Sequence, residues 1–415
     1  MVNSQNICVL HSTYIEFCTL PLFTGIYMNF ELSDQQLAIQ DAISRICHDF
    51  GEDYWRERDS DGKFPEEFVG AITEGGWLGI AMPEEYGGAD LGVSEALILA
   101  HTIARSGAGM SGASAVHLNL FGPNPIVVFG THEQKSRFLP PLIQGRDRAC
   151  FGVTEPNSGL NTSKLETRAD RDGDNYVING QKLWTTTAQT ASKILLIART
   201  TPLSECERPT DGLSLFFTDL DREKIEVRLI EKMGRKAVDS NSLFIDNLIV
   251  PVQDRIGEEG DGWKCLLHGL NPERILIAAE AVGLGQAALE RAANYARERV
   301  VFDRPIGKNQ AIQHPLAVNW MELEAAMLMV FKAASIYDRG EPCGVEANTA
   351  KYLAAEAALS ACQRSVLTHG GMGYAKEYHV ERYLREIMIP VIAPVSQEMI
   401  KSFIGERVLG QEKSY

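Results

Sequence analysis

One acid in the sequence stands out as a candidate for proton transfer. Glu273 follows Asn271-Pro272 and is itself followed by Arg274. Asn and Pro are favoured at the first positions of a helix, so the sequence predicts that a helix begins here with Glu273 in its first turn. An acid at that position is usually a partner of the helix dipole, which lowers its pKa, whereas burial beneath a substrate raises the pKa toward that of a general base. The local sequence leaves both roles open.

Two further segments have the composition of ligand-binding loops. The small and polar residues from Phe151 to Gly159 leave backbone N–H groups free for a phosphate or a flavin edge, although an ordinary surface turn has the same composition. In the segment from Lys182 to Thr187, Trp184 stands beside hydroxyl side chains. The Trp184 ring can stack on a ligand ring while the neighbouring hydroxyls donate to the nitrogens of that ligand. Alternatively, Trp184 can be an aromatic side chain that is buried in a strand.

Other motifs are less specific. The junction from Arg299 to Gln313 is basic, so it either meets phosphates or forms a solvated loop. The segment 283–288 matches a G-x-G-x-x-A dinucleotide fingerprint, but no strand–helix–strand unit surrounds it, and we expect close helix packing there instead. No H-E-x-x-H or H-x-x-x-H pair occurs, so no metal site is predicted.

Length and composition limit the possible classes of protein. A chain of 415 residues exceeds one ordinary hydrophobic core, so two or three domains are expected. The net charge of −15 argues against nucleic acid and anionic membrane surfaces as partners. No apolar run reaches the roughly 18 residues of a membrane span. The eight cysteines lack C-x-x-C spacing, which favours a reducing compartment: bacterial cytoplasm, or alternatively the mitochondrial or peroxisomal matrix.

Hydrophobic periodicity divides the chain into four stretches. Residues 1–27 contain no Lys or Arg and are predicted to be an extension outside the fold. Residues 28–148 are predicted to be helical, with Ser33 capping the first helix. Residues 149–255 contain short β runs, and Asn179-Gly180 predicts a hairpin turn among them. Residues 256–415 are helical again, so the predicted fold class is α+β, mostly α.

Six short segments resemble the acyl-CoA dehydrogenase family, in the expected order from about Asn29 to the C-terminus. They are Pro83-Glu84-Glu85-Tyr86-Gly87-Gly88, Val153-Thr154-Glu155-Pro156, Asn179-Gly180-Gln181-Lys182-Leu183-Trp184-Thr185-Thr186, Arg299-Val300-Val301-Phe302, Gln310-Ala311-Ile312-Gln313 and Gly370-Gly371-Met372-Gly373-Tyr374. The resemblance implies a helical N-terminal domain, a middle antiparallel β domain and a C-terminal four-helix bundle, with FAD between the last two. It also implies a homotetramer in which one subunit completes its neighbour's FAD site.

The resemblance implies two groups of cofactor contacts. The first group is expected around the flavin ring and consists of Phe151, Val153, Thr154, Trp184 and Thr186. In this group Trp184 would shield one face of the ring, and Thr186 would lie near N5. The second group is expected at the rest of the cofactor, mostly at the adenine and pyrophosphate half of the neighbour's FAD. It consists of Arg299, Phe302, Gln310, Gly370, Gly371 and Ser396.

The usual position of the family's base lacks an acid here. Many members carry the base in a Tyr-Glu-Gly-Thr segment near the C-terminus, where this sequence has Ala393-Pro394-Val395-Ser396. A subset resembling the isovaleryl-CoA and long-chain enzymes instead places a Glu ahead of an Arg early in a bundle helix. Glu273-Arg274 matches that pattern, so Glu273 is the predicted base and Arg274 a predicted substrate contact. Proline also lacks the N–H that the family uses at position 394 to bind the thioester oxygen.

The resemblance thus implies α,β-dehydrogenation of an acyl-CoA in fatty acid or branched-chain acyl metabolism. A base removes the α-proton, the β-hydrogen leaves as hydride to FAD, and electrons pass to an electron-transfer flavoprotein. Two alternatives keep the fold: a flavin oxidase or monooxygenase, and a catalytically silent acyl-CoA-binding subunit.

Overall fold

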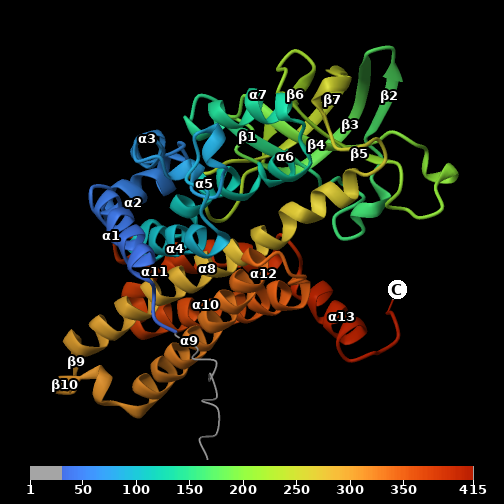
Figure 1. Cartoon of the computed structure of the whole chain (residues 1–415). Helices are drawn as coiled ribbons and strands as arrows, with labels where there is room; N and C mark the ends of the chain where they lie inside the picture. Colours follow the sequence, from blue (N-terminus) through green and yellow to red (C-terminus); the bar gives the residue numbers. More distant parts are fainter. Residues whose placement is uncertain (1–29, 415) are drawn as a thin grey trace, which may run out of the picture.

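The computed structural model describes residues 30–414, which form three parts in the order helical, β, helical (Figure 1). The β part lies above the long C-terminal helices in Figure 1, and the N-terminal helices cover the flank of both. This arrangement confirms the predicted fold class. The predicted extension, residues 1–27, lies outside the described residues.

The N-terminal part begins where the sequence predicts. Ser33 Oγ accepts a hydrogen bond from the backbone N–H of Gln36, and Gln36 Oε1 accepts one from the backbone N–H of Ser33. Helix α5 (Gly109–Phe121) consists mostly of small and apolar residues and is almost entirely buried, so it holds its His117 in the interior. The helices of this part are α1 (Asp34–His48), α2 (Glu52–Asp61), α3 (Glu66–Glu74), α4 (Val93–Ile103), α5 (Gly109–Phe121), α6 (Asn124–Phe129) and α7 (His132–Ile143).

The middle part is one sheet with strand order β6-β7-β3-β2-β4-β5-β8, and β1 pairs with β4. The pairs β1–β4 and β2–β4 are parallel, and the other pairs are antiparallel. The strands are β1 (Ala149–Gly152), β2 (Arg168–Asp172), β3 (Asn175–Thr186), β4 (Lys193–Arg199), β5 (Leu213–Asp219), β6 (Ile225–Leu229), β7 (Ser240–Pro251) and β8 (Arg255–Ile256).

The predicted hairpin turn at Asn179-Gly180 is wrong. Strand β3 runs straight through both residues, and its register against β7 shifts between Ile178 and Gly180. A Cβ atom at Gly180 would lie 2.4 Å from Thr167 Oγ1, so the glycine serves close packing and not a turn. The turn between β2 and β3 is formed earlier by Gly173, whose φ is +57°. Tertiary packing therefore overrode a local turn signal.

The C-terminal part is built on three long helices, α8 (Gly262–Glu298), α9 (Gln310–Asp338) and α10 (Gly344–His369). The shorter helices α11 (Val380–Glu386) and α12 (Met388–Ile392) pack against α8 and α10, and α13 (Gln397–Arg407) follows. A two-stranded hairpin, β9 (Val300–Val301) with β10 (Arg304–Pro305), joins α8 to α9. Gly283 and Gly285 confirm the predicted close packing: a Cβ on them would lie 2.5 Å from His101 O and 2.9 Å from Ala358 Cα.

The predicted helix start at Asn271-Pro272 is also wrong. Helix α8 begins at Gly262 and passes through Pro272 without ending. A proline inside a helix cannot donate to the carbonyl four residues earlier, which here belongs to His268. Asn124 Nδ2 donates to that carbonyl at 2.8 Å instead. A side chain from α6 thus satisfies the carbonyl that the proline leaves free, and Glu273 lies inside the helix.

One stretch within residues 30–414, Val380–Arg407, is long and apolar enough by composition to cross a membrane. The chain there is divided among α11, α12 and α13, with non-helical backbone at residues 393–396.

Candidate active site

Glu273 occupies an enclosed position on α8. Its side chain is partly buried, and its Oε2 atom is fully enclosed without a hydrogen-bond partner. Burial raises the pKa of Glu273 to about 7, against the lowering effects of His117, Arg274 and Lys351. The carboxyl lies inside a helix and not at its end, so the helix dipole does not hold the pKa down. Burial, which raises the pKa of Glu273, is therefore stronger than the helix dipole, which would lower it.

Arg274, the predicted substrate contact, lies beside the acid. Its Nη1 donates to Asn271 Oδ1 at 2.9 Å, while its Nε is enclosed without a partner. Burial lowers the pKa of this guanidinium. An enclosed cation with free hydrogen-bonding capacity suits a polar substrate group.

A lysine that sequence reasoning missed reaches the segment around Pro394. Lys351 on α10 is fully buried, and its Nζ donates to the backbone carbonyl of Val395 at 2.5 Å. Burial and the neighbouring Arg274 lower the pKa of Lys351 to about 8. Ser396, a predicted cofactor contact, caps α13 by accepting from the backbone N–H of Met399.

The segment with Phe151, Val153 and Thr154 is fastened by a buried ion pair. Lys182 Nζ lies 2.8 Å from Glu155 Oε1 and 3.2 Å from the carbonyl oxygen of Val153. Glu155 also accepts from the backbone N–H groups of Glu166 and Thr167. Because both charged groups are buried and bonded, the loop after β1 has little freedom to move.

A break in β3 sets the position of Trp184. The register against β7 shifts between Lys182 and Thr185, and Trp184 between them has φ of +62°. The bulge leaves the indole 54% exposed, so the buried-strand interpretation of Trp184 is wrong. Thr186 Oγ1 accepts from Arg235 Nη2 at 3.4 Å.

Aromatic contacts link the expected flavin position to the acid. The rings of Phe151 and Phe121 meet edge to face at 6.1 Å, and Phe121 meets the His117 ring at 4.6 Å. His117 Nδ1 lies 2.5 Å from Glu280 Oε1, and Glu280 is seven residues after Glu273 on α8. We refer to Glu273, Arg274, His117, Glu280 and Lys351 as the base end.

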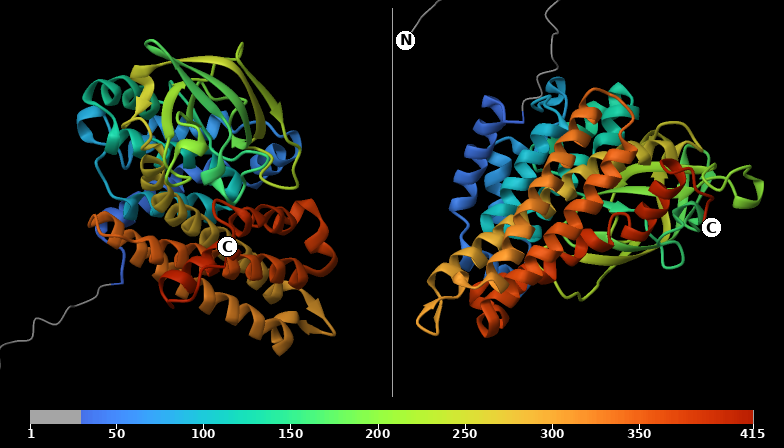
Figure 2. Two further views of the ribbon diagram at one scale, coloured as in Figure 1. Left: turned by 90° about the vertical axis from the view of Figure 1, so that its right-hand side faces the viewer. Right: turned by 90° about the horizontal axis from the view of Figure 1, so that it is seen from below.

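The other predicted cofactor contacts lie at the far end of the bundle. Figures 1 and 2 place the β9–β10 hairpin at the end of the long helices remote from the sheet. Along α8, the 26 residues from Glu273 to Arg299 correspond to roughly 39 Å. His369 stacks on Tyr295 at 4.3 Å, which brings Gly370 to the same end. We refer to the following residues, which are all exposed, as the hairpin end: Arg299, Phe302, Gln310, Gly370 and Gly371.

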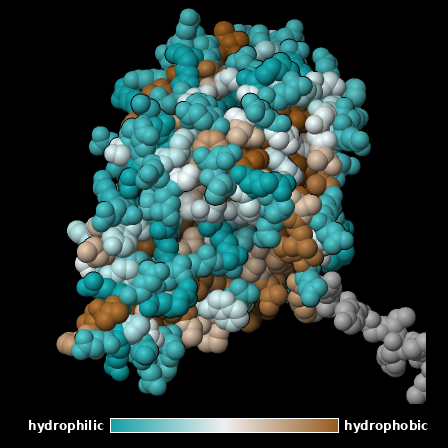
Figure 3. Space-filling model, turned by 90° about the vertical axis from the view of Figure 1, so that its left-hand side faces the viewer, coloured by the Kyte–Doolittle hydropathy of each residue, from teal (hydrophilic) through white to brown (hydrophobic). Residues whose placement is uncertain are grey.

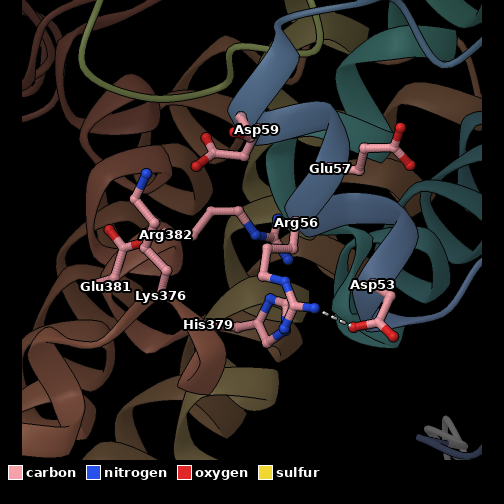
Figure 4. Close-up of a pocket in the computed structure, with 9 residues that line it drawn as sticks. Asp53, Arg56, Glu57, Asp59, Lys376, His379, Glu381 and Arg382 are labelled. Carbon is pink, nitrogen blue, oxygen red and sulfur yellow. Dashed lines mark ion pairs between the residues drawn. The ribbon is translucent and has the colours of Figure 1, made fainter.

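A separate cavity of about 520 Å³ lies between α2 and the segment around α11, and Figure 4 shows residues that line it. Charged side chains of both signs line it, among them Asp53, Arg56 and Lys376. None of the predicted site residues lines this cavity, so it is distinct from the candidate site.

Comparison with known proteins identifies the family. The N-terminal, middle and C-terminal domain models of acyl-CoA dehydrogenase match residues 33–146, 150–248 and 260–409. The chain belongs to the acyl-CoA dehydrogenase family. It is 34% identical to the acyl-CoA dehydrogenase FadE12 of Mycobacterium tuberculosis, over 92% of this chain and 98% of the relative.

Solved structures agree with this assignment. Butyryl-CoA dehydrogenase from Megasphaera elsdenii aligns with a TM-score of 0.87 and 31% identity, over 92% of this chain and all of that one. A chain in a structure of the electron transferring flavoprotein of Acidaminococcus fermentans aligns with a TM-score of 0.88 and 30% identity, at the same coverage.

This acyl-CoA dehydrogenase is an FAD-dependent oxidoreductase, as its family is. The residues present fit that cofactor. Trp184 offers an exposed ring face, and added Cβ atoms at Gly370 and Gly371 would meet nothing within 4 Å, so the backbone there is open to close approach. No sequence signal pointed to His117, Glu280, Arg235 or Lys351, because contacts across the fold create their roles.

Proposed function

We propose that this enzyme converts a saturated acyl-CoA to the 2-enoyl-CoA with Glu273 as the base, and that it passes electrons to an electron-transfer flavoprotein. Bound FAD supplies the hydride acceptor. Glu273 accepts the proton from the α-carbon. The carrying observation is the enclosed, unpartnered carboxyl of Glu273 with its pKa near 7. A general base works best when its pKa lies close to the operating pH.

The substrate thioester needs donors for the charge that develops on its oxygen. Position 394 is proline and supplies no N–H. Lys351 places a cationic donor beside this segment, and Arg274 adds a second one next to the base. Charge-assisted donors in an enclosed site stabilise a developing oxyanion more strongly than they do in water. Their buried positions support a role in orienting the thioester.

The similar chain in an electron transferring flavoprotein structure supports the proposed electron acceptor. The test is an anaerobic titration of the FAD-loaded enzyme with straight-chain, branched and aryl-substituted acyl-CoAs, observed as loss of flavin absorbance. We expect at least one substrate to bleach the flavin, and turnover to require added electron-transfer flavoprotein. Rapid turnover in air without that acceptor would indicate an oxidase or monooxygenase. A flavin that no acyl-CoA reduces would indicate a silent binding subunit.

We also propose that a second copy of the chain completes each FAD site, as in a homotetramer. Phe302 is 93% exposed, and Tyr374, next to Gly373, is 89% exposed, although both are aromatic. Apolar side chains interrupt the polar surface over the lower half of the face in Figure 3, where the bundle lies. The hairpin end lies too far along α8 to meet the base end of its own chain. Light scattering of the FAD-loaded protein should therefore give an oligomer mass, and a monomer that retains FAD would contradict the proposal.

A further inference from the structure

The base end contains a buried ion pair that the proposed reaction does not use directly. His117 on α5 and Glu280 on α8 are 8% and 0% exposed, and their Nδ1 and Oε1 atoms lie 2.5 Å apart. The second oxygen of Glu280 is enclosed without a hydrogen-bond partner. A buried polar pair with an unpaired oxygen costs free energy, so packing between the two helices does not by itself account for it.

The pair lies beside the base. Glu273 and Glu280 are seven residues apart, so both project from the same side of α8 with two helical turns between them. The His117 ring also contacts Phe121, which in turn contacts Phe151 at the expected flavin position. The pair therefore lies on the side of α8 that carries the base, and two aromatic contacts connect it to the expected flavin position.

The charges around these groups come from four elements. The charged groups that act on Glu273 are His117 from α5, Arg274 and Glu280 from its own helix, and Lys351 from α10. His117 faces Glu280, Glu273 and Arg235, which lies between β6 and β7. Burial lowers the pKa of His117, but Glu280 and Glu273 raise it, and the balance lies above the ordinary value. The imidazole therefore binds a proton more readily than a free histidine does, and its charged form opposes the effect of burial on Glu273.

We propose that His117, held in place by Glu280, is a positioning residue that keeps Glu273 ionised and able to accept the α-proton once the acyl chain has displaced water. Substrate binding removes solvent from Glu273 and drives it toward its neutral form, which cannot act as a base. The protonated form of His117, fixed by Glu280 in the same enclosed space, counteracts that drive without contacting the substrate. This inference rests on the proposed function, since it assigns Glu273 as the base.

The decisive variant is His117→Gln, which keeps a hydrogen-bonding side chain but removes the cation. The rate of anaerobic flavin reduction should fall at low pH as Glu273 becomes protonated, and we call this part of the pH profile the acid limb. Because the pKa of Glu273 should rise in the variant, the acid limb should move to higher pH by about 1 to 3 units. The rate should recover at high pH, because Glu273 ionises there without help. The probe is the acyl-CoA from the panel above that reduces wild-type flavin fastest.

The fold offers a matched control in His101. It is a buried histidine on α4 that contacts Gln286 on α8 at 2.7 Å, and burial lowers its pKa to about 4, so it is neutral. His101→Gln should leave the acid limb in place. The double variant His117→Gln/Glu280→Gln removes both charges and should shift the limb less than His117→Gln alone. A double variant shifted as far as the single one would assign the effect to lost packing.

A second readout does not depend on turnover. The infrared band of a protonated carboxyl that disappears in Glu273→Gln reports the titration of Glu273 in the FAD-loaded protein. That titration should move to higher pH in His117→Gln. If wild-type flavin is reduced but neither the acid limb nor the infrared titration moves, the role of His117 is overturned while the proposed function stands. If no acyl-CoA reduces wild-type flavin, the proposed function fails, and the infrared titration still decides whether His117 tunes Glu273.

Discussion

The two ends of the helical bundle differ in how completely one chain builds them. At the base end, Glu273, His117, Glu280 and Lys351 come from three helices and are held inside the molecule. At the hairpin end, Phe302, Arg299 and Gln310 are exposed. The groups proposed for proton transfer are thus in place within a single chain, whereas those expected to hold the adenine half of the cofactor lack a partner surface. Chemistry and cofactor retention should therefore respond differently to mutation.

The largest expected effect is on chemistry at the base end. Glu273→Gln keeps the shape of the side chain but removes the proton acceptor. Flavin reduction by acyl-CoA, measured anaerobically by stopped flow, should slow by at least ~100-fold. FAD content and acyl-CoA binding should stay close to wild type. A variant that reduces its flavin at the wild-type rate would place the base elsewhere, and the assignment of position 394 would need revision first.

The next largest effect concerns the loop that carries Val153 and Thr154. Lys182→Met leaves the Glu155 carboxylate buried without its cation, so the free energy of unfolding should fall by about 3 to 5 kcal/mol. The matched control is Lys193→Met, whose partner Asp219 is 77% exposed, and this change should cost about 0 to 1 kcal/mol. Urea unfolding at pH 7 measures both. Equal losses in the two variants would contradict the proposed anchoring of this loop.

A third effect follows from the raised pKa of Glu273. The unfolded chain ionises this carboxyl near its ordinary value of 4.5, but the folded protein does so only near 7. Folding is therefore favoured at low pH, and this contribution is lost as the pH rises through 7. At about 1.4 kcal/mol per pKa unit, Glu273→Gln should stabilise the protein by up to about 3 kcal/mol at pH 8.5 and leave it unchanged at pH 4. Thermal midpoints of the FAD-loaded protein at the two pH values provide the measurement, and stabilisation at pH 4 would be inconsistent with this cause.

The smallest effect should appear at the hairpin end. Arg299→Ala removes one exposed cation, and the loss of a charge-assisted hydrogen bond should weaken FAD retention by about tenfold. Assembly should weaken with it, because a ligand held only by the assembled state stabilises that state. Arg168→Ala changes a 65% exposed arginine on β2 and serves as the control. Unchanged FAD affinity in the Arg299 variant would argue against a shared cofactor site.

The sequence predicts much of the fold correctly, because local patterns reflect local physics. Ser33 with Gln36 forms the predicted cap, and Gly283 and Gly285 allow the predicted helix contact. Local patterns mislead where a distant group changes the balance. Asn271-Pro272 resembles a helix start, but Asn124 satisfies the carbonyl that Pro272 leaves free, so the helix continues. Asn179-Gly180 resembles a turn, but the glycine is needed for close contact with Thr167 within a strand.

By itself the sequence determined the identity of the candidate base, because it shows directly that position 273 holds a glutamate and that position 394 holds a proline in place of an acid. It could not determine how that acid ionises. His117 lies 163 residues from Glu280 along the chain, and Lys351 comes from yet another helix. Only the packing of α5, α8 and α10 brings these groups together and removes water from them. Because burial and neighbouring charges set a pKa, the tertiary structure alone decided that Glu273 titrates near neutral pH.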